Sequence, residues 1–363
     1  MRIATILGLT TALCASAGTT YNVVQEYAGP TFFDGWDFYG NFDNLTNGDA
    51  IFVSSSEATS QRLAYVDPST NHAIIKVDNT SRVAFNEKRN TVRITSQDRF
   101  AIGSVWVADM LHVPYGCSVW PAFWSQAPAW PEGGEIDTFE GVNQVTRNQM
   151  ALHTNPGCSL RQDPTSLTQT SSIINSTNCD SAANENSGCV VTDPSLQSYG
   201  EVFAKGGGGV FVTEFAEEGI SVWFFPRDLV PQSLSSNTTS LDTSKLGKPT
   251  ANWPSGPGGC DINTFFQPQN LIFDITLCGD FAGAPNVFSQ TCSGKCYNDY
   301  VIGDPSTYDN AYFDVASVRV YGEVGKQVVL QKGQSGNSGI GIRVSGLGVL
   351  VSSLVIGGMM VMI

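Results

Sequence analysis

The segment Trp130-Pro-Glu-Gly-Gly-Glu135-Ile-Asp137-Thr-Phe-Glu140-Gly carries three carboxylates within six residues. On a strand, side chains alternate between faces, so Glu135 and Asp137 share one face. A regular strand would turn Glu140 to the opposite face, but one extra residue in a β-bulge around Thr138 and Phe139 brings it back. We therefore predict a bulged strand with all three acids on one surface and apolar residues pointing into a core.

Such an arrangement of acids suits hydrolysis of glycosidic bonds. Retaining glycosidases use two carboxyl groups about 5–5.5 Å apart. The alternative is a solvated strand face without chemistry. Like charges placed side by side on a strand repel, so three acids kept together beside Trp130 favour a catalytic use.

Further motifs flank this segment on both sides. They are Trp120-Pro-Ala-Phe-Trp124 before it, and Gly141-Val-Asn143, Leu152-His153-Thr154 and Gly157-Cys158 after it. Together these residues resemble glycoside hydrolase family 16. The five-residue step from Glu135 to Glu140 resembles its laminarinase branch, the fungal endo-1,3(4)-β-glucanases, and the likeness covers roughly residues 25–322.

The resemblance implies an all-β fold, a β-jelly-roll sandwich of two antiparallel sheets with a concave substrate cleft. It implies a retaining endo-β-glucanase that hydrolyses internal β-1,3 and mixed-linkage β-1,4 bonds. Glu135 would be the nucleophile, Glu140 the acid and base, and Asp137 would orient Glu135. No cofactor or catalytic metal is expected, although family members often carry a structural calcium for which this sequence has no clear ligand run.

Two other functions remain open at this point. A cell-wall β-glucan transglycosylase would use the same intermediate with a sugar hydroxyl as acceptor. A non-catalytic β-glucan-binding protein would suit the fold, but the intact Glu135 and Glu140 argue against it. The sequence does not fix the linkage preference, because loop shape decides it.

Three tryptophans are expected to bind the sugar rings. Trp120 and Trp124 lie on one face of their strand, and Phe123 points to the opposite face. Trp130 directly precedes the acids. The apolar faces of sugars stack on such rings, whereas the alternative for each ring is packing in the core.

Four more binding residues are implied by the family resemblance. Arg93 would lie on the sugar-binding face, and the alternative is a solvated strand charge. His153 would lie beside the carboxylates, and the alternative is a core or edge histidine. Asn143 belongs to the matching motif, and Trp253 stands in an Asn-Trp-Pro context that contacts substrate in the family.

The composition indicates one large all-β domain. The 363 residues include 37 glycines and 10% aromatics, which suits short strands and turns. A net charge of −14 excludes nucleic acid as a natural partner, because phosphate binding needs clustered Lys and Arg. We expect a monomer that acts on β-glucan.

The N-terminal residues 1–17 are expected to be a secretory signal peptide, with an apolar run after Met1-Arg2 and small residues at its end. Cleavage removes Cys14 and leaves a catalytic domain at 18–323. The eight remaining cysteines indicate disulfides with open pairing: Cys117, Cys158, Cys179, Cys189, Cys260, Cys278, Cys292 and Cys296. Cys292 and Cys296 are spaced for a small local loop.

The C-terminal region is expected to direct attachment of a glycosylphosphatidylinositol (GPI) anchor. Residues 324–338 form a polar linker with Ser335 and Asn337 as attachment candidates, and 339–363 form a signal with an apolar end that is removed. A retained tail anchor is the alternative. The protein would then be secreted and held at the cell surface or wall. Four sequons are candidate glycan sites: Asn44, Asn79, Asn175 and Asn237.

Overall fold

The computed structural model describes residues 19–161 and 171–333. The predicted signal peptide, Cys14, Ser335, Asn337 and the C-terminal GPI signal lie outside these residues and stay predictions. Within the described ranges, no helix has the length and apolar character needed to cross a membrane.

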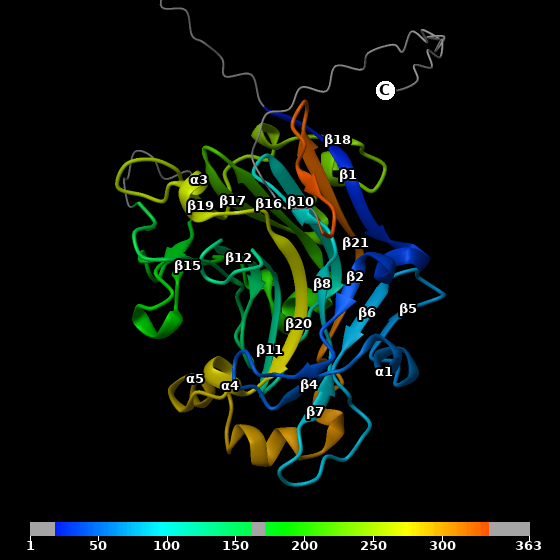
Figure 1. Cartoon of the computed structure of the whole chain (residues 1–363). Helices are drawn as coiled ribbons and strands as arrows, with labels where there is room; N and C mark the ends of the chain where they lie inside the picture. Colours follow the sequence, from blue (N-terminus) through cyan, green and yellow to red (C-terminus); the bar gives the residue numbers. More distant parts are fainter. Residues whose placement is uncertain (1–18, 162–170, 334–363) are drawn as a thin grey trace, which may run out of the picture.

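Two large antiparallel sheets pack face to face and form the predicted jelly-roll sandwich (Figure 1). The first sheet has the order β18 (Ser240–Asp242), β1 (Thr20–Ala28), β21 (Tyr312–Glu323), β10 (Ser104–His112), β16 (Gly209–Ala216), β17 (Gly219–Pro226) and β19 (Ala251–Pro254). Two further strands extend it, since β6 (Ala73–Lys76) pairs with β21 and β5 (Ala64–Val66) pairs with β6. We call this the back sheet.

The second sheet carries the acidic segment, and we call it the front sheet. Its order is β14 (Ile173–Ile174), β15 (Cys189–Thr192), β13 (Gln149–His153), β12 (Glu135–Glu140), β11 (Val119–Gln126), β20 (Asn270–Leu277), β8 (Arg93–Ser96) and β2 (Trp36–Phe38). Figure 1 shows β11 and β20 strongly curved along their length.

Smaller elements surround the two sheets. They are the strands β3 (Asn41–Phe42), β4 (Ala50–Phe52), β7 (Arg89–Thr91), β9 (Arg99–Phe100) and β22 (Val329–Leu330), and the helices α1 (Ser55–Ser60), α2 (Gly200–Lys205), α3 (Ile262–Phe265), α4 (Gly279–Ala282) and α5 (Pro285–Thr291).

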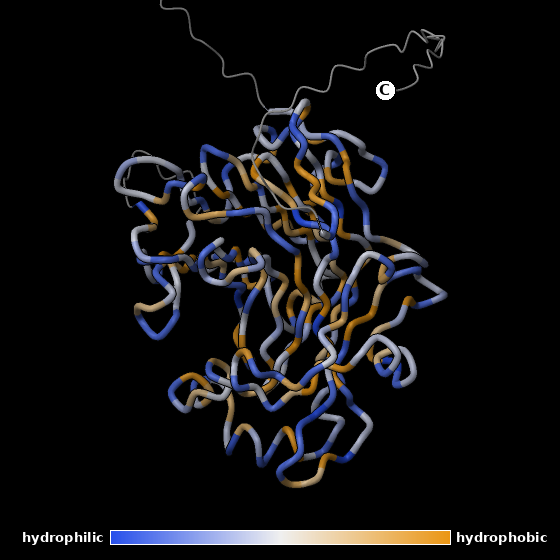
Figure 2. Tube along the Cα trace, viewed as in Figure 1, coloured by the Kyte–Doolittle hydropathy of each residue, from blue (hydrophilic) through white to orange (hydrophobic). Residues whose placement is uncertain are grey.

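The main hydrophobic core fills the space between the sheets. Phe139 of the front sheet stacks on Tyr199 with ring centroids 5.3 Å apart, and meets Phe211 of the back sheet edge-on at 5.4 Å. Figure 2 shows the hydrophobic segments gathered along the central strands and the hydrophilic ones in the outer loops. Each large side chain buried in this way stabilises the fold by about 1.5–3 kcal/mol.

A second hydrophobic cluster covers the outer face of the back sheet. It includes Val105, Val212 and Trp223 of the strands and Leu234 of the segment that crosses them. The Arg319 guanidinium holds this segment by donating to the carbonyl oxygen of Leu234 at 2.6 Å. The outer face of the back sheet is therefore closed by polypeptide at this cluster, whereas the outer face of the front sheet carries the acids.

Four disulfides link distant parts of the domain. The pairs are Cys117–Cys292, Cys158–Cys260, Cys179–Cys189 and Cys278–Cys296. The predicted local loop between Cys292 and Cys296 is wrong. Cys292 lies directly after α5 and bonds Cys117, just before β11. Cys296 begins the helical turn Cys296–Val301 and bonds Cys278, just after β20.

The predicted polar linker, 324–338, starts before the folded domain ends. Val328 is buried, and β22 pairs with β9 at Val329↔Phe100. The folded domain therefore continues past Glu323 to at least Leu330, and the boundary at 323 is corrected.

Candidate active site

The predicted bulge is present in β12. The pairing of β12 with both neighbouring strands slips between Asp137 and Glu140. Thr138 and Phe139 are both fully buried, and the Thr138 hydroxyl lies 2.6 Å from that of Thr213 on the back sheet. Two successive side chains thus point into the core, and Glu140 returns to the face of Glu135 and Asp137.

Asn148 takes up the backbone groups that the bulge leaves without strand partners. Its Oδ1 accepts a hydrogen bond from the Glu140 amide at 2.9 Å, and its Nδ2 donates to the Thr138 carbonyl at 3.0 Å. Asn148 is fully buried, so these bonds form away from water. This side chain fixes the backbone from which the Glu140 carboxyl projects.

A row of register partners crosses the front sheet at the level of Glu140. Arg93 is paired with Asp274, Asp274 with Ala122, Ala122 with Glu140, and Glu140 with Gln149. Directly opposed residues of a sheet share a face. Arg93 therefore lies on the acid-bearing face, in agreement with the prediction.

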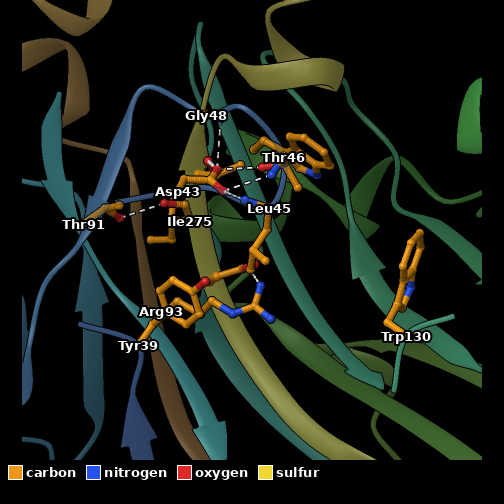
Figure 3. Close-up of polar contacts among 12 residues, drawn as sticks. Tyr39, Asp43, Leu45, Thr46, Gly48, Thr91, Arg93, Trp130 and Ile275 are labelled. Carbon is orange, nitrogen blue, oxygen red and sulfur yellow. Dashed lines mark hydrogen bonds and ion pairs between the residues drawn. The ribbon is translucent and has the colours of Figure 1, made fainter. Parts of the chain in front are cut away.

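Arg93 is held between aromatic rings on this face. Its guanidinium lies 4.9 Å from the Trp124 ring centroid and 5.5 Å from that of Tyr39, and it pairs with Asp274 at 3.0 Å. Figure 3 shows Tyr39 beside Arg93, and Trp130 well apart from them. The Arg93 guanidinium is thus fixed by one ion pair and two aromatic rings.

Both carboxylate oxygens of Glu140 accept hydrogen bonds. Trp120 Nε1 donates to Oε1 at 2.8 Å, and Gln149 Nε2 donates to Oε2 at 2.6 Å. Burial raises the pKa of Glu140, and these two donors oppose the rise without cancelling it. A carboxyl with a raised pKa is suited to donate a proton.

Glu135 lies between Trp130 and Asp137. The Trp130 indole nitrogen donates to its Oε2, and the exposed fraction of Trp130 is 44%. Burial and then the charge of Asp137 raise the pKa of Glu135. Because the charges of Glu135 and Asp137 repel, a cation beside them is needed to keep Glu135 ionised.

His153 supplies that cation. Its Nε2 is 3.3 Å from Asp137 Oδ2 and 4.0 Å from Glu135 Oε1. Burial lowers the pKa of His153, but the carboxylates of Glu135, Asp137 and Glu140 outweigh this and raise it to about 10. The prediction that His153 lies beside the acids agrees with these distances.

The same three side chains form a candidate metal-ligand set. One atom each of Glu135, Asp137 and His153 lies within 4.8 Å of the others. A metal binds histidine through an unprotonated nitrogen. The pKa of His153 is raised by the carboxylates beside it, so its ring is protonated. The imidazolium then supplies the positive charge beside the two acids, and its nitrogen is not free to bind a metal. The expectation of a reaction without a catalytic metal, and the question of structural calcium, stay predictions.

Two predicted binding residues are placed elsewhere. Trp253 has an exposed fraction of 0% and belongs to the core between the sheets, so its ring is not available to a sugar. Asn143 is also fully buried; its Oδ1 accepts from the Ser118 backbone amide at 2.8 Å, and its Nδ2 donates to the Ala282 carbonyl at 3.0 Å. Both assignments are corrected to structural roles.

Several residues of the site were not predicted from the sequence. Gln149 bonds Glu140, and Asn186 lies against His153. Arg93 is contacted by Tyr39 and Asp274. Alternation from His153 along 149–153 would have found Gln149. Asn186 lies 33 residues from its partner, in a loop, and no periodic signal marks it.

The fold and the bulged acidic strand define a glycoside hydrolase with a jelly-roll catalytic domain. The model of XgeA-like catalytic domains of glycoside hydrolase family 16 matches residues 36–321. The chain belongs to this family and carries its catalytic domain.

Several fungal proteins are similar in sequence to this chain. A probable glycosidase of Schizosaccharomyces pombe is 40% identical over 304 residues, covering 83% of this chain and 69% of that protein. An endo-1,3(4)-β-glucanase of Arthroderma benhamiae is 37% identical over 85% of this chain and 66% of that protein. This chain covers about half the length of further relatives of the same name from Aspergillus, for example 47% of the Aspergillus fumigatus protein.

Solved structures of family 16 enzymes are also similar to this chain. Laminarinase 16A of Phanerochaete chrysosporium, described with β-glucans in its donor and acceptor sites, has 36% identity and a TM-score of 0.78, over 83% of this chain and 99% of that one. An elongating β-1,3-glucosyltransferase of family 16 has 34% identity and a TM-score of 0.74, with the same coverage.

Proposed function

We propose that the protein is a retaining endo-β-glucanase that hydrolyses internal β-1,3 bonds, and β-1,4 bonds of mixed-linkage glucans. The observation that carries this proposal is the bulge in β12, which turns Glu135 and Glu140 to one face and gives each its own hydrogen-bond donors. Relatives named endo-1,3(4)-β-glucanase support the substrate class.

The proposed reaction has two displacements. Glu135 attacks the anomeric carbon, the glycosidic C–O bond breaks, and Glu140 gives its proton to the departing oxygen. Water then attacks the same carbon, Glu140 takes its proton, and the bond to Glu135 breaks. Configuration is retained, and the nucleophile-first order follows the family pattern.

The two carboxyls have different surroundings. The nucleophile must be ionised while the acid is protonated. His153 favours the ionised form of all three acids, although burial and Asp137 still raise the pKa of Glu135 to about 8, and Glu140 is bonded by the uncharged donors of Trp120 and Gln149. Asp137 contacts His153 and so links the cation to the nucleophile.

The open face provides the features of a neutral glucan site. Trp120, Trp124 and Trp130 present partly exposed or exposed rings, and Arg93 offers donors beside Trp124. The laminarinase from Phanerochaete was solved with 6-O-glucosyl-laminaritriose, which supports β-1,3-glucans with 1,6-branches as further substrates.

Location outside the cell fits the four disulfides, which persist in oxidising compartments. We propose secretion followed by GPI anchoring through the C-terminal region at the cell surface or wall.

The test is Glu135→Gln. The substitution keeps the size and removes the nucleophile, so turnover of laminarin should fall at least about 10³-fold while circular dichroism and thermal unfolding stay native-like. Products from laminarin, lichenan and xyloglucan are resolved by mass and anomer. Surviving activity in Glu135→Gln would remove Glu135 from the mechanism.

Transglycosylation is the second candidate function. It is favoured by the similarity to the elongating glucosyltransferase at a TM-score of 0.74. The same intermediate would then pass to a sugar hydroxyl in place of water. Products longer than a defined laminari-oligosaccharide substrate would identify this reaction, and products that are only shorter would identify hydrolysis.

A further inference from the structure

A short loop beside the catalytic acids is held in an unusual conformation. The disulfide Cys179–Cys189 closes it with a sequence separation of 10. The three consecutive residues at 184–186 have φ values of 51°, 56° and 60°. The left-handed region costs energy for residues other than glycine, with Asn the most tolerant. Such strain persists where the surroundings impose it, often near functional sites.

The loop contacts His153 through Asn186. Asn186 Oδ1 lies 3.0 Å from His153 Nδ1. A carbonyl oxygen only accepts, so Nδ1 carries a proton and donates. On the other side of the ring, Nε2 lies 3.3 Å from Asp137 Oδ2 and 4.0 Å from Glu135 Oε1. These are ion-pair distances, and the nearby carboxylates raise the pKa of His153 to about 10, which favours the ring protonated on both nitrogens.

The loop backbone also packs on the imidazole ring. Gly188 has a φ of 67°, and a Cβ added there would lie 2.8 Å from His153 Cε1 and Nε2 and 2.6 Å from the Leu152 carbonyl. Any side chain at 188 would displace the ring or the strand. Two independent contacts therefore show that the loop is fitted to His153.

We propose that the loop from Cys179 to Cys189 is a positioning element of the active site, in which Asn186 holds His153 so that its Nε2 stays beside Asp137 and Glu135. This inference rests on the proposed function for its catalytic part. Asn186 acts through His153, so it is a positioning residue. It keeps the cation aimed at the nucleophile through both displacements.

The charged groups that act on His153 all come from β12. They are Glu135, Asp137 and Glu140, whereas the loop contributes the uncharged Asn186 and the Gly188 backbone. Removal of Asn186 should leave the electrostatic attraction in place and remove the acceptor for Nδ1–H. The imidazolium then loses one stabilising hydrogen bond and one constraint on its orientation.

The test compares two matched variants by NMR. Asn186→Ala removes the acceptor, and Asn184→Ala makes the same change in the same loop, at an exposed position with a similar φ. The chain has only three histidines, so the ring nitrogens of His153 can be followed directly against pH in labelled protein. The expected result is a His153 titration at least about one pH unit lower in Asn186→Ala and unchanged in Asn184→Ala.

Activity on laminarin provides the second readout. Asn186→Ala should lower kcat about tenfold with little change in KM, Asn184→Ala should stay within about twofold, and Asn186→Asp should restore most of kcat because it again accepts from Nδ1–H. The same His153 titration in both alanine variants, or a neutral His153 at pH 7 in the native chain, would overturn the proposal. The NMR result needs no substrate, so absence of glucanase activity would count against the proposed function alone.

Discussion

At the residue scale, the distinction between Glu135 and Glu140 lies in their partners. Glu135 shares its surroundings with Asp137 and the cation of His153, whereas Glu140 is bonded by the uncharged donors of Trp120 and Gln149. Both pKa values are raised by burial first. Burial and the charge of Asp137, opposed by His153, raise the pKa of Glu135 to about 8, so these charges do not assign the proton to Glu140, and that assignment follows the family pattern.

Gln149 offers a direct way to move the proton affinity of Glu140. Its donor stabilises the ionised carboxylate, so Gln149→Ala should raise the pKa of Glu140 further, by on the order of one unit. The alkaline limb of the kcat/KM profile should move to higher pH, and kcat should fall several-fold because the carboxyl is less well oriented.

The measurement is the pH profile of laminarin hydrolysis. Gln232→Ala is the control, since this exposed glutamine contacts Ser235 in the segment over the back sheet. An alkaline limb that stays in place, or moves to lower pH, would separate Gln149 from the ionisation of Glu140.

At the element scale, β12 could be predicted because its signal is local. Alternation and the spacing of the three acids fixed both the face and the position of the bulge at Thr138 and Phe139. Its support could not be predicted. Asn148 bonds both sides of the bulge, but nothing in its own sequence context separates it from an ordinary turn residue.

Two other elements show where sequence arguments fail. The face of Trp253 depends on how β19 pairs with β17 at the sheet edge, and an Asn-Trp-Pro context does not contain that register. The short spacing of Cys292 and Cys296 indicated a local bridge, but helical turns on both sides direct the two sulfurs apart. Long-range geometry decided both cases.

At the scale of the whole molecule, buried acids connect function to stability. Burial raises the pKa of Asp193 to about 7, and burial, opposed by Arg93, leaves the pKa of Asp274 at about 6. The pKa of His153 is raised to about 10 by the nearby carboxylates, against burial. In each case the native state holds a proton that the unfolded chain releases at a lower pH.

The sign of the pH dependence follows from these shifts. Between the unfolded and folded pKa values the native state binds more protons, so stability is lost as pH rises. For the acids this window runs from about 4 to about 7, and for His153 from about 6.5 to about 10. The free energy of unfolding should therefore fall from pH 5 to pH 9.

Urea unfolding with intact disulfides at pH 5, 7 and 9 measures this trend. The decrease should be on the order of 1 kcal/mol or more, and Asp193→Asn should make the slope between pH 5 and 7 shallower. Stability that increases across this range would show that these groups are not protonated in the native state as described.

The central claim is that one kinked strand turns two acids to the same face, with Glu135 as the group that bonds the sugar. The most direct measurement is mass spectrometry of peptides after reaction with a 2-deoxy-2-fluoro-β-glucosyl or laminaribiosyl fluoride, which slows release of the intermediate. A single glycosyl group on Glu135 is expected. A label on Glu140, or a fully inactivated enzyme with no label on β12, would contradict it.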